Sequence, residues 1–395
     1  MALSARFVLL VGLFLLVGCD QADLETPDPP PAGNQFATYV AIGNSITAGV
    51  QSDGINATTQ RQSYAVKVAA QLGTEFNSPL LAAPGCRPPL VNPFTGARVG
   101  GATDTTCALR VRPLPDVLHN VAVPRAAVID VLDNLDADAN ANELTFLMLG
   151  GRTQIEAAAA ADPTFVSVWI GDNDVLSPAL AGDPTRITPV DTFEVRYTAL
   201  LDRLDNLDVE RGVLIAVGDV TLAPNFSEGQ TYWALSQQPN RFPPTFAVAD
   251  NCRPTAPGAT TLVPFDYGFG LIGAAAEGAS VTLDCLNDDE VLTAPEAQTV
   301  RGAVNDYNSF IEQQARERGW AFVDVNPIVE DLRDAGAVPT FPNTQRPGQA
   351  FGPYFSLDGV HPSGLAHDVV ANEVIAALND TYDTDIPLLD VPAQP

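Results

Sequence analysis

The 395-residue sequence predicts an α/β protein with helices on both faces of a parallel sheet. Short apolar runs alternate with longer stretches that have helical spacing, and polar residues or glycines follow the runs. Strands separated by helices pair in parallel, because the chain must cross back over the sheet between them. No internal repeat or second domain is evident, so we expect one domain over residues 36–385.

The expected elements follow from the spacing of apolar residues. In the segment 191–207, for example, Phe193, Tyr197, Leu200 and Leu204 recur at the interval of a helix with one buried face. Strands are expected at 39–43, 165–170, 213–217 and 321–325. Helices are expected at 63–72, 154–161, 191–207, 294–318 and 365–378.

Two segments do not fit this alternation. Residues 86–122 and 224–292 are rich in Pro, Gly and polar residues, and each contains two cysteines. Loops of this length in a compact domain are usually functional or cross-linked, so we expect insertions around the mouth of a site. The second segment carries aromatic residues that either line an acyl groove or form the insertion's own core: Tyr232, Trp233, Phe242, Phe246, Phe265 and Tyr267.

The N-terminus predicts export. Arg6 precedes an apolar run at 7–17, which is too short to span a bilayer comfortably and is typical of a signal peptide over 1–18. The end of this run, followed by Cys19, resembles a bacterial lipobox, in which the cysteine is lipidated; an ordinary signal peptide with an incidental Cys19 is the alternative. We expect a lipid anchor at Cys19, a location in the bacterial cell envelope outside the cytoplasm, and a flexible acidic, Pro-rich tether over 19–35.

A C-terminal tail is expected at 386–395, and we expect the protein to be a monomer.

The formal net charge of −28, with Lys67 as the only lysine, disfavours nucleic acid as a partner, because there is no basic surface to replace phosphate counterions. Strong acidity fits a salt-adapted host. A GC-rich genome is the alternative, although it explains the scarcity of lysine and not the acidic excess.

The cysteines other than Cys19 number four, which in an exported protein suggests two disulfides. We favour Cys86–Cys107 and Cys252–Cys285, because these pairs close the shortest loops. A zinc site is disfavoured by the spacing of the cysteines and by the presence of only three histidines, so we expect no metal.

Ser45 and a distant Asp–His pair supply the parts of an acyl-transfer site. Ser45 follows the expected strand at 39–43, which places it at the carboxyl edge of the sheet, where α/β proteins bind ligands. Asp358 lies three residues before His361, so a tight turn lets the carboxylate orient the imidazole that takes the serine proton. The alternatives are a capping serine and a surface histidine, with His119 and His367 as competing bases.

An oxyanion intermediate requires hydrogen-bond donors aimed at its position. Asn173 follows the expected strand at 165–170 and offers a side-chain amide, and Gly85 offers a backbone N–H without a Cβ in the way. The N–H of Ser45 is the third expected donor. The alternatives are a plain Pro-Gly turn at Gly85 and a turn or cation site at Asp172 and Asp174.

Four short blocks together resemble the SGNH or GDSL family of hydrolases. The blocks are GNSITAG around Ser45, the glycine at Gly85, GDND around Asn173, and DGVHPS around His361, in the order of that family. The resemblance implies a three-layer α/β/α sandwich of flavodoxin-like topology that hydrolyses small-molecule or lipid esters without a cofactor. It implies an acyl-enzyme mechanism with Ser45, His361 and Asp358 as the triad. A carbohydrate O-deacetylase and a non-catalytic binding lipoprotein are the alternatives.

Overall fold

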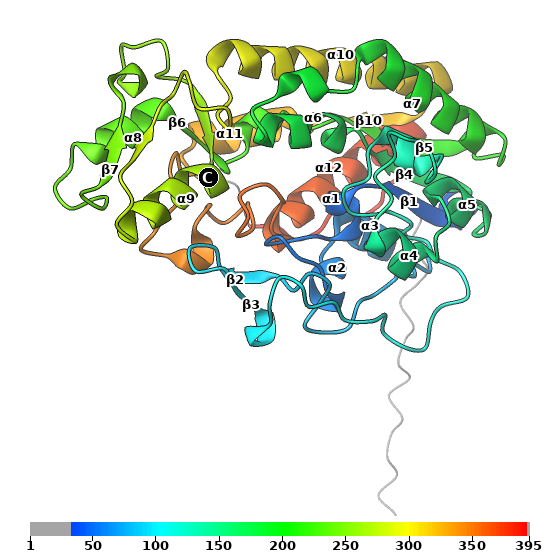
Figure 1. The fold of residues 1–395 in the computed structure, drawn as a ribbon. Helices are drawn as coiled ribbons and strands as arrows, with labels where there is room; N and C mark the ends of the chain where they lie inside the picture. Colours follow the sequence, from blue (N-terminus) through cyan, green and yellow to red (C-terminus); the bar gives the residue numbers. More distant parts are fainter. Residues whose placement is uncertain (1–32, 393–395) are drawn as a thin grey trace, which may run out of the picture.

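A central parallel sheet organises the computed structural model, which describes residues 33–392. The sheet has the order β1–β4–β5–β10, and every neighbouring pair is parallel (Figure 1). The four predicted strands are confirmed; the second ends one residue earlier than expected, the third begins and ends two residues earlier, and the fourth ends two residues earlier. Their bounds are β1 Tyr39–Gly43, β4 Phe165–Trp169, β5 Arg211–Ile215 and β10 Ala321–Val323.

A further segment pairs with the outer edge of β1. Ala41 donates its N–H to the carbonyl of His119 at 2.8 Å, and Val121 donates to the carbonyl of Ala41 at 3.0 Å. The bridge between Ala41 and Asn120 is parallel. With this edge counted, the order along the sheet is that of flavodoxin-like folds. In these folds the strand that follows β1 in the chain is added on one side of it and the later strands on the other, so the strand order reverses between β1 and β4. The edge therefore lies within the segment 86–122, which the sequence predicts to be an insertion.

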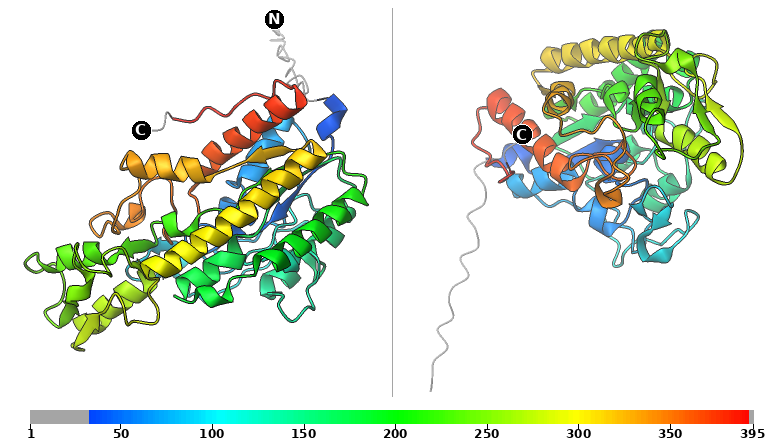
Figure 2. Two further views of the ribbon diagram at one scale, coloured as in Figure 1. Left: turned by 90° about the horizontal axis from the view of Figure 1, so that it is seen from above. Right: turned by 90° about the vertical axis from the view of Figure 1, so that its left-hand side faces the viewer.

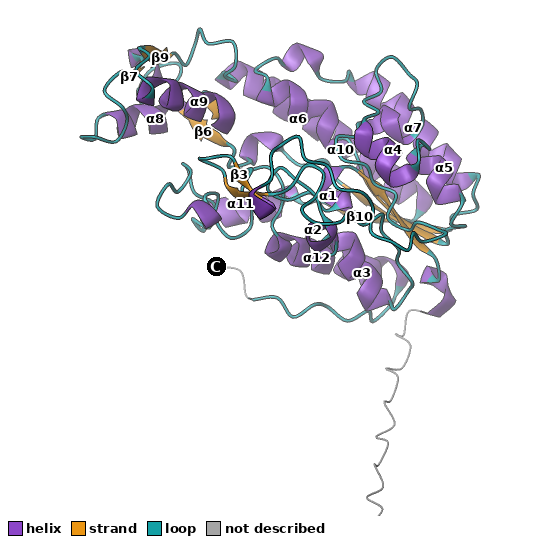
Figure 3. Ribbon diagram, turned by 60° about the horizontal axis from the view of Figure 1, so that its bottom comes forward, coloured by secondary structure: helices purple, strands orange, loops and turns teal. Residues whose placement is uncertain are grey.

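Helices cover both faces of the sheet, which confirms the predicted three-layer architecture (Figures 2 and 3). One face carries α3 (Tyr64–Leu72) and α12 (Gly364–Tyr382). The other carries α5 (Gln154–Ala159), α7 (Val190–Asp205) and α10 (Ala294–Arg318). All five predicted helices are present with shifts at their ends, except α10, which has the predicted bounds.

The strands are buried on both faces, as a sheet between two helical layers requires. Along β1, Tyr39 and Ala41 pack into the core beneath α3 and α12, whereas Val40 and Ile42 pack into the core beneath α5, α7 and α10. All four side chains are inaccessible to solvent. The alternation follows from the two-residue period of a strand, and it fixes the direction in which the end of β1 points.

Short helices follow the strands or line the loops near their carboxyl ends. Two of them, α1 and α6, begin at the ends of β1 and β4 and therefore lie at the point where the chain direction reverses. The bounds of these helices are α1 Ser45–Ala48, α2 Ala57–Gln60, α4 Glu143–Leu149, α6 Asp172–Leu180 and α11 Asn326–Asp334.

The two insertions have structure of their own. The first contains the hairpin β2 (Leu90–Asn92) and β3 (Ala97–Arg98). The second contains two small sheets and two helices, and it projects away from the helical layers (Figure 1). Both predicted disulfides, Cys86–Cys107 and Cys252–Cys285, are present. The elements of the second insertion are β6 Phe226–Glu228, α8 Gly229–Ser236, β7 Phe246–Val248, β8 Leu262–Pro264, α9 Phe265–Ala276 and β9 Val281–Leu283.

Most aromatic residues of the second insertion form its own core. Tyr232 and Phe246 are buried there with the Cys252–Cys285 disulfide, and Trp233, Phe242 and Tyr267 pack against them. Phe265 is the exception, because it packs with Phe351 in a separate cluster. Of the two alternatives for these residues, the internal core is thus confirmed for all but Phe265.

The predicted signal peptide, Cys19 and most of the tether lie outside the described residues. The expected C-terminal tail begins with Ile386, which is buried and donates its N–H to the Asn379 side chain of α12. Within residues 33–392, no helix combines the length and the apolar character that a membrane crossing requires.

Candidate active site

Ser45 is the first residue of α1, immediately beyond β1. Asn44 caps this helix, with its side-chain oxygen accepting the N–H of Ile46 at 2.9 Å. Gly43 is required by close packing, since an added Cβ would lie 2.3 Å from the hydroxyl of Thr47 and 2.7 Å from the carbonyl of Trp169. The tight turn leaves Ser45 8% exposed at the carboxyl edge of the sheet, as the sequence predicts.

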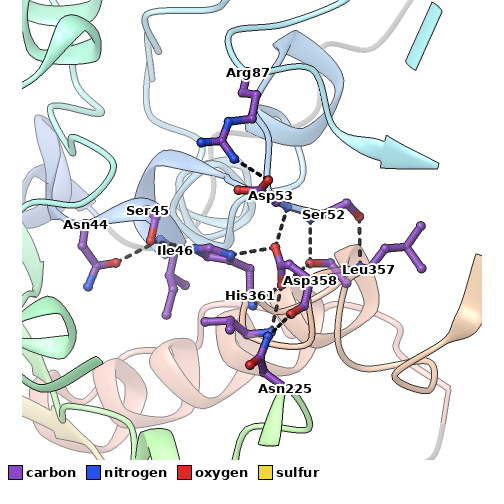
Figure 4. A network of polar contacts seen from close by, with 12 residues as sticks. Asn44, Ser45, Ile46, Ser52, Asp53, Arg87, Asn225, Leu357, Asp358 and His361 are labelled. Atoms are coloured by element: carbon purple, nitrogen blue, oxygen red, sulfur yellow. Dashed lines mark hydrogen bonds and ion pairs between the residues drawn. The ribbon is translucent and has the colours of Figure 1, made fainter. Parts of the chain in front are cut away.

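Ser45, His361 and Asp358 form one hydrogen-bonded chain (Figure 4). The Ser45 hydroxyl lies 2.8 Å from His361 Nε2, and His361 Nδ1 lies 2.8 Å from Asp358 Oδ2. The structure therefore brings together these three predicted residues, although Ser45 and His361 are 316 positions apart in the sequence. The geometry is that of a nucleophile, a base and a carboxylate that orients the base.

A tight turn from Asp358 to His361 holds the base in place. Asp358 Oδ1 accepts the N–H groups of Val360 and His361, both at 2.8 Å. Gly359 has a φ of +68°, and an added Cβ would lie 2.7 Å from the ring of Phe351. The local pattern Asp-Gly-Val-His thus builds the turn and the ion pair together.

The charges of the pair support each other. Burial raises the pKa of Asp358, but the His361 charge and several hydrogen bonds outweigh it and lower the pKa to about 2. Burial lowers the pKa of His361, but the Asp358 carboxylate outweighs it and holds the pKa above its ordinary value. Asp358 is therefore ionised near neutral pH, and its charge favours the protonated form of the His361 imidazole.

A second layer of contacts fixes Asp358. The N–H of Asp53 donates to Asp358 Oδ2 at 2.6 Å, which completes the partners of that oxygen. The Asp53 carboxylate in turn pairs with Arg87 and with Arg98, both at 2.6 Å. Both arginines come from the first insertion, and the Arg98 side chain is only 7% exposed. The sequence gives no signal for the role of these residues, since Asp53 in Ser-Asp-Gly has the pattern of an ordinary turn residue.

Asn225, at the start of the second insertion, ties the catalytic turn to that insertion. Its side chain donates to the carbonyl of Asp358 at 2.8 Å and accepts the N–H of Phe265 at 3.3 Å. Its own N–H donates to the carbonyl of Gly359 at 2.8 Å. Both insertions thus contact the turn that carries the base, directly or through Asp53, and the sequence gives no signal for this role of Asn225.

The predicted oxyanion donors are placed unequally. Asn173, in the first turn of α6, lines the space in front of Ser45, and its amide donates to the carbonyl of Ala126 at 2.9 Å. The amide carries a second N–H, and the N–H of Ser45 forms no hydrogen bond within residues 33–392. Gly85 has a φ of +127° but does not line the cavities beside Ser45, whereas the adjacent Cys86 lines one of them.

Asp172, one of the alternative cation ligands, has both carboxylate oxygens bound by protein donors, whereas Asp174 is bound through Oδ2 and its buried Oδ1 has no partner among the described residues. Asp172 accepts the Asn44 amide at 2.6 Å and the N–H of Gly218 at 2.9 Å, and burial raises its pKa. Asp174 accepts the N–H of Val128 at 3.0 Å, and burial raises its pKa to about 6. Across the described part of the chain, no three His, Cys, Asp or Glu side chains gather as a metal-binding group.

The competing histidines have structural partners elsewhere. His119 accepts the N–H of Asn77 at 2.9 Å, at the edge segment beside β1. His367 accepts the N–H of Tyr64 at 3.2 Å and is fully buried between α3 and α12, where burial and the nearby Lys67 charge lower its pKa to about 3. Neither histidine lines the space around Ser45.

Two cavities open beside Ser45. The first, called the apolar cavity below, has about 980 Å³ including its mouth and is lined by side chains of α6, α11 and α12. The second, called the polar basin, has about 2200 Å³ including its mouth and is lined by the first insertion, by three residues of the second, and by loops around Asp53, Asn142 and Asp358. Five residues line both spaces, namely Ser45, Asn173, Leu176, Val360 and His361. A reacting ester at Ser45 thus has room on two sides.

The chain is similar to solved structures of other proteins. The chain aligns over 91% of its length with the acetylxylan esterase Axe2 of Geobacillus stearothermophilus, at 15% identity, 99% coverage of that chain and a TM-score of 0.39. It aligns over 87% with a protein of Parabacteroides merdae assigned to the GDSL-like lipases, at 14% identity, 95% coverage of that chain and a TM-score of 0.38. No curated protein sequence matches the chain.

The family of this chain is shown by its match to a family model, since the TM-scores of these two structures are too low to identify a substrate. The model of the GDSL-like lipases and acylhydrolases matches residues 39–374, from the first strand of the sheet into α12. This range contains Ser45, Asn173, Asp358 and His361. The chain therefore belongs to the GDSL-like lipase/acylhydrolase family and is a carboxylic ester hydrolase.

Proposed function

We propose that this hydrolase cleaves its ester through a covalent acyl-enzyme, with Ser45 as nucleophile, His361 as general base and Asp358 as the residue that orients the base. The observation that carries the proposal is the unbroken chain of two 2.8 Å contacts from the Ser45 hydroxyl through the imidazole to a buried carboxylate. A serine hydroxyl is a weak nucleophile until a base within hydrogen-bond reach removes its proton.

The first step forms the acyl-enzyme. Ser45 Oγ attacks the ester carbonyl while His361 Nε2 takes the hydroxyl proton, and the electron pair of the C=O bond moves onto oxygen. The Ser45 N–H and the second N–H of the Asn173 amide stabilise this oxyanion in our proposal, and the Gly85 N–H is not assigned to it because Gly85 lines neither cavity. When the tetrahedral intermediate collapses, the C–O bond to the alcohol breaks and His361 returns the proton to the leaving oxygen. Water, deprotonated by His361, then releases the acid and Ser45.

The test compares the purified full chain with its Ser45→Ala variant on nitrophenyl esters from acetyl to palmitoyl, with a fluorophosphonate probe as a second readout. We expect turnover and labelling in the wild type and neither in the variant. Equal trace activity in both, without labelling of Ser45, would contradict the proposal and revive a non-catalytic binding role. Release of acetate from acetylated xylan, with no turnover of longer acyl esters, would favour the carbohydrate deacetylase.

We further propose that the protein is exported and anchored through lipid on Cys19, and that it acts as a monomer. Two disulfides among the described residues support an oxidising compartment. Because Ser45, His361 and Asp358 come from a single chain, the proposed reaction requires no second subunit. In the source cell, Cys19→Ala is expected to abolish palmitate incorporation and release the protein from the membrane fraction. Membrane retention of this variant, or a dimer mass in light scattering, would contradict the respective proposal.

A further inference from the structure

The two cavities at Ser45 differ in chemistry, and this difference bears on the substrate. An ester bound at a serine extends on one side as its acyl chain and on the other as its alcohol. Because Ser45 and His361 lie on the border of the apolar cavity and the polar basin, one part of the substrate occupies each space.

The apolar cavity suits the acyl chain. Its walls are largely aliphatic and aromatic side chains from four parts of the fold, and the carboxylates along it are engaged by protein groups: Asp172 by Asn44, and Asp219 by Thr221. Each methylene buried in such a space strengthens binding about fourfold. The apolar lining residues include Trp169, Leu176, Val220, Ile328, Val329, Leu332, Tyr354 and Val369.

The polar basin suits a hydroxyl-rich alcohol and disfavours an anionic one. Its charged lining residues comprise five carboxylates and three guanidinium groups. Two of those guanidinium groups, on Arg87 and Arg98, are already paired with Asp53. Amide side chains add donors and acceptors that match hydroxyl groups. The charged residues are Asp53, Asp104, Glu143, Asp266 and Asp358, with Arg87, Arg98 and Arg125.

Asp266 is a carboxylate of the basin whose charge interacts with those of Asp53 and Asp358, beside the turn that carries His361. It lies in the first turn of α9 and is exposed, and among the described residues it forms no hydrogen bond or ion pair through its side chain. Although the side chain remains open to solvent, its partial desolvation, together with the Asp53 and Asp358 carboxylates, raises its pKa, and Arg87 opposes this. An incoming phosphate would therefore meet unbalanced negative charge, whereas a hydroxyl group would meet an acceptor.

We propose that the enzyme cleaves esters of a medium or long apolar acyl chain with a neutral, hydroxyl-rich alcohol such as glycerol or a sugar. The chain occupies the apolar cavity and the alcohol occupies the polar basin, where Asp266 selects against anionic alcohols. This inference rests on the proposed catalytic role of Ser45, since the two spaces matter only if the ester reacts at their border.

The acyl side is tested with Val329→Trp on α11, which fills the apolar cavity, beside Glu330→Trp at the next, exposed position as the matched control. For the wild type, kcat/KM is expected to rise by up to about fourfold per methylene from butyrate to octanoate esters. Val329→Trp is expected to lower kcat/KM for the octanoate ester by about tenfold or more, with little effect on the acetate ester. An acetate optimum in the wild type, or equal losses on both esters, would overturn the inference while leaving Ser45 as nucleophile.

The alcohol side is tested with one acyl chain on two alcohols, monooctanoylglycerol and octanoyl-glycerol 3-phosphate, both as monomers in solution. We expect the neutral ester to be preferred by about tenfold at low salt, and added salt to narrow the ratio by screening. Asp266→Asn is expected to narrow the ratio by about threefold, whereas Glu277→Gln at the far end of α9 leaves it unchanged. An equal or reversed preference in the wild type would overturn the inference. Absence of any Ser45-dependent turnover would instead refute the proposed function.

Discussion

Replacement of Asp358 by Asn tests the triad most directly, because it replaces one carboxylate oxygen by an NH2 group and keeps the shape of the side chain. Asp358 Oδ1 accepts the N–H groups of Val360 and His361, so the new NH2 is expected at the position of Oδ2. There it faces His361 Nδ1 and the N–H of Asp53. The imidazole must then accept through Nδ1 and carry its proton on Nε2, which faces the Ser45 hydroxyl. In this tautomer His361 cannot take the serine proton.

The expected loss in kcat is roughly 10⁴-fold, as for a triad base held in the wrong tautomer. This corresponds to about 5 kcal/mol in the activation barrier. Stability falls as well, since the lowered pKa of Asp358, about 2, means that the ionised carboxylate stabilises the fold at pH 7. That contribution amounts to about 2 kcal/mol; it is present above the unfolded pKa of about 4 and is lost as the pH falls towards 2. Donor–donor contact with Asp53 adds about 1–3 kcal/mol.

The assay measures kcat and urea unfolding for the wild type, Asp358→Asn and Asp331→Asn, the last being an exposed carboxylate on α11. The control is expected to match the wild type in both measurements. A kcat for Asp358→Asn within about tenfold of the wild type would refute the assignment of Asp358 as the orienting carboxylate, because the wrong tautomer cannot sustain that rate. Unchanged stability would refute the inferred contacts of its carboxylate.

Other predictions concern the base, the cap of α1 and the oxyanion. Because the pKa of His361 is raised and the base must be neutral, the acid limb of kcat/KM is expected to have its midpoint above pH ~6.5; a pH profile with a midpoint well below 6.5 would contradict this. Asn44→Asp places a carboxylate against buried Asp172 and is expected to lower the free energy of unfolding by about 3 kcal/mol. The double variant Asn44→Asp/Asp172→Asn is expected to regain most of this stability; additive effects of the two substitutions in urea unfolding would argue against the contact. Asn173→Ala is expected to lower kcat by roughly 10²–10³-fold, and a change in KM alone would argue against an oxyanion role.

The hydrogen-bonded chain from Ser45 through His361 to Asp358 could be predicted from the sequence, because each of its parts lies in a recognisable local sequence pattern. Ser45 follows a five-residue apolar strand, and the three-residue spacing of Asp358 and His361 is sufficient for the turn that joins them. The helices could be predicted for the same reason, since the apolar spacing of α7 and the Thr293–Glu296 capping box of α10 are local sequence patterns. Local patterns of this kind survive in the fold because tertiary packing agrees with them.

The surroundings of the site could not be predicted, because they depend on contacts between distant segments. Asp53 meets Asp358 across 305 positions, and Asn225 meets the same turn across 133 positions. Ser52 and Asp53 adopt φ values of +56° and +51°, which nothing in Gln-Ser-Asp-Gly specifies beyond a turn. Aromatic residues of an insertion can line a groove or form a core, and their sequence does not distinguish the two. That Phe265 packs outside the insertion's own core therefore depends on the tertiary structure.

The separation of Ser45 from His361 by 316 positions has a consequence for biosynthesis. Ser45 emerges early in synthesis, whereas His361 arrives just before the last helix, after β10 has completed the sheet. Closing a loop of this length is entropically costly until the intervening strands have paired. Under the proposed mechanism, a growing or truncated chain therefore has no reactive serine, and hydrolytic activity begins only when the whole domain has folded.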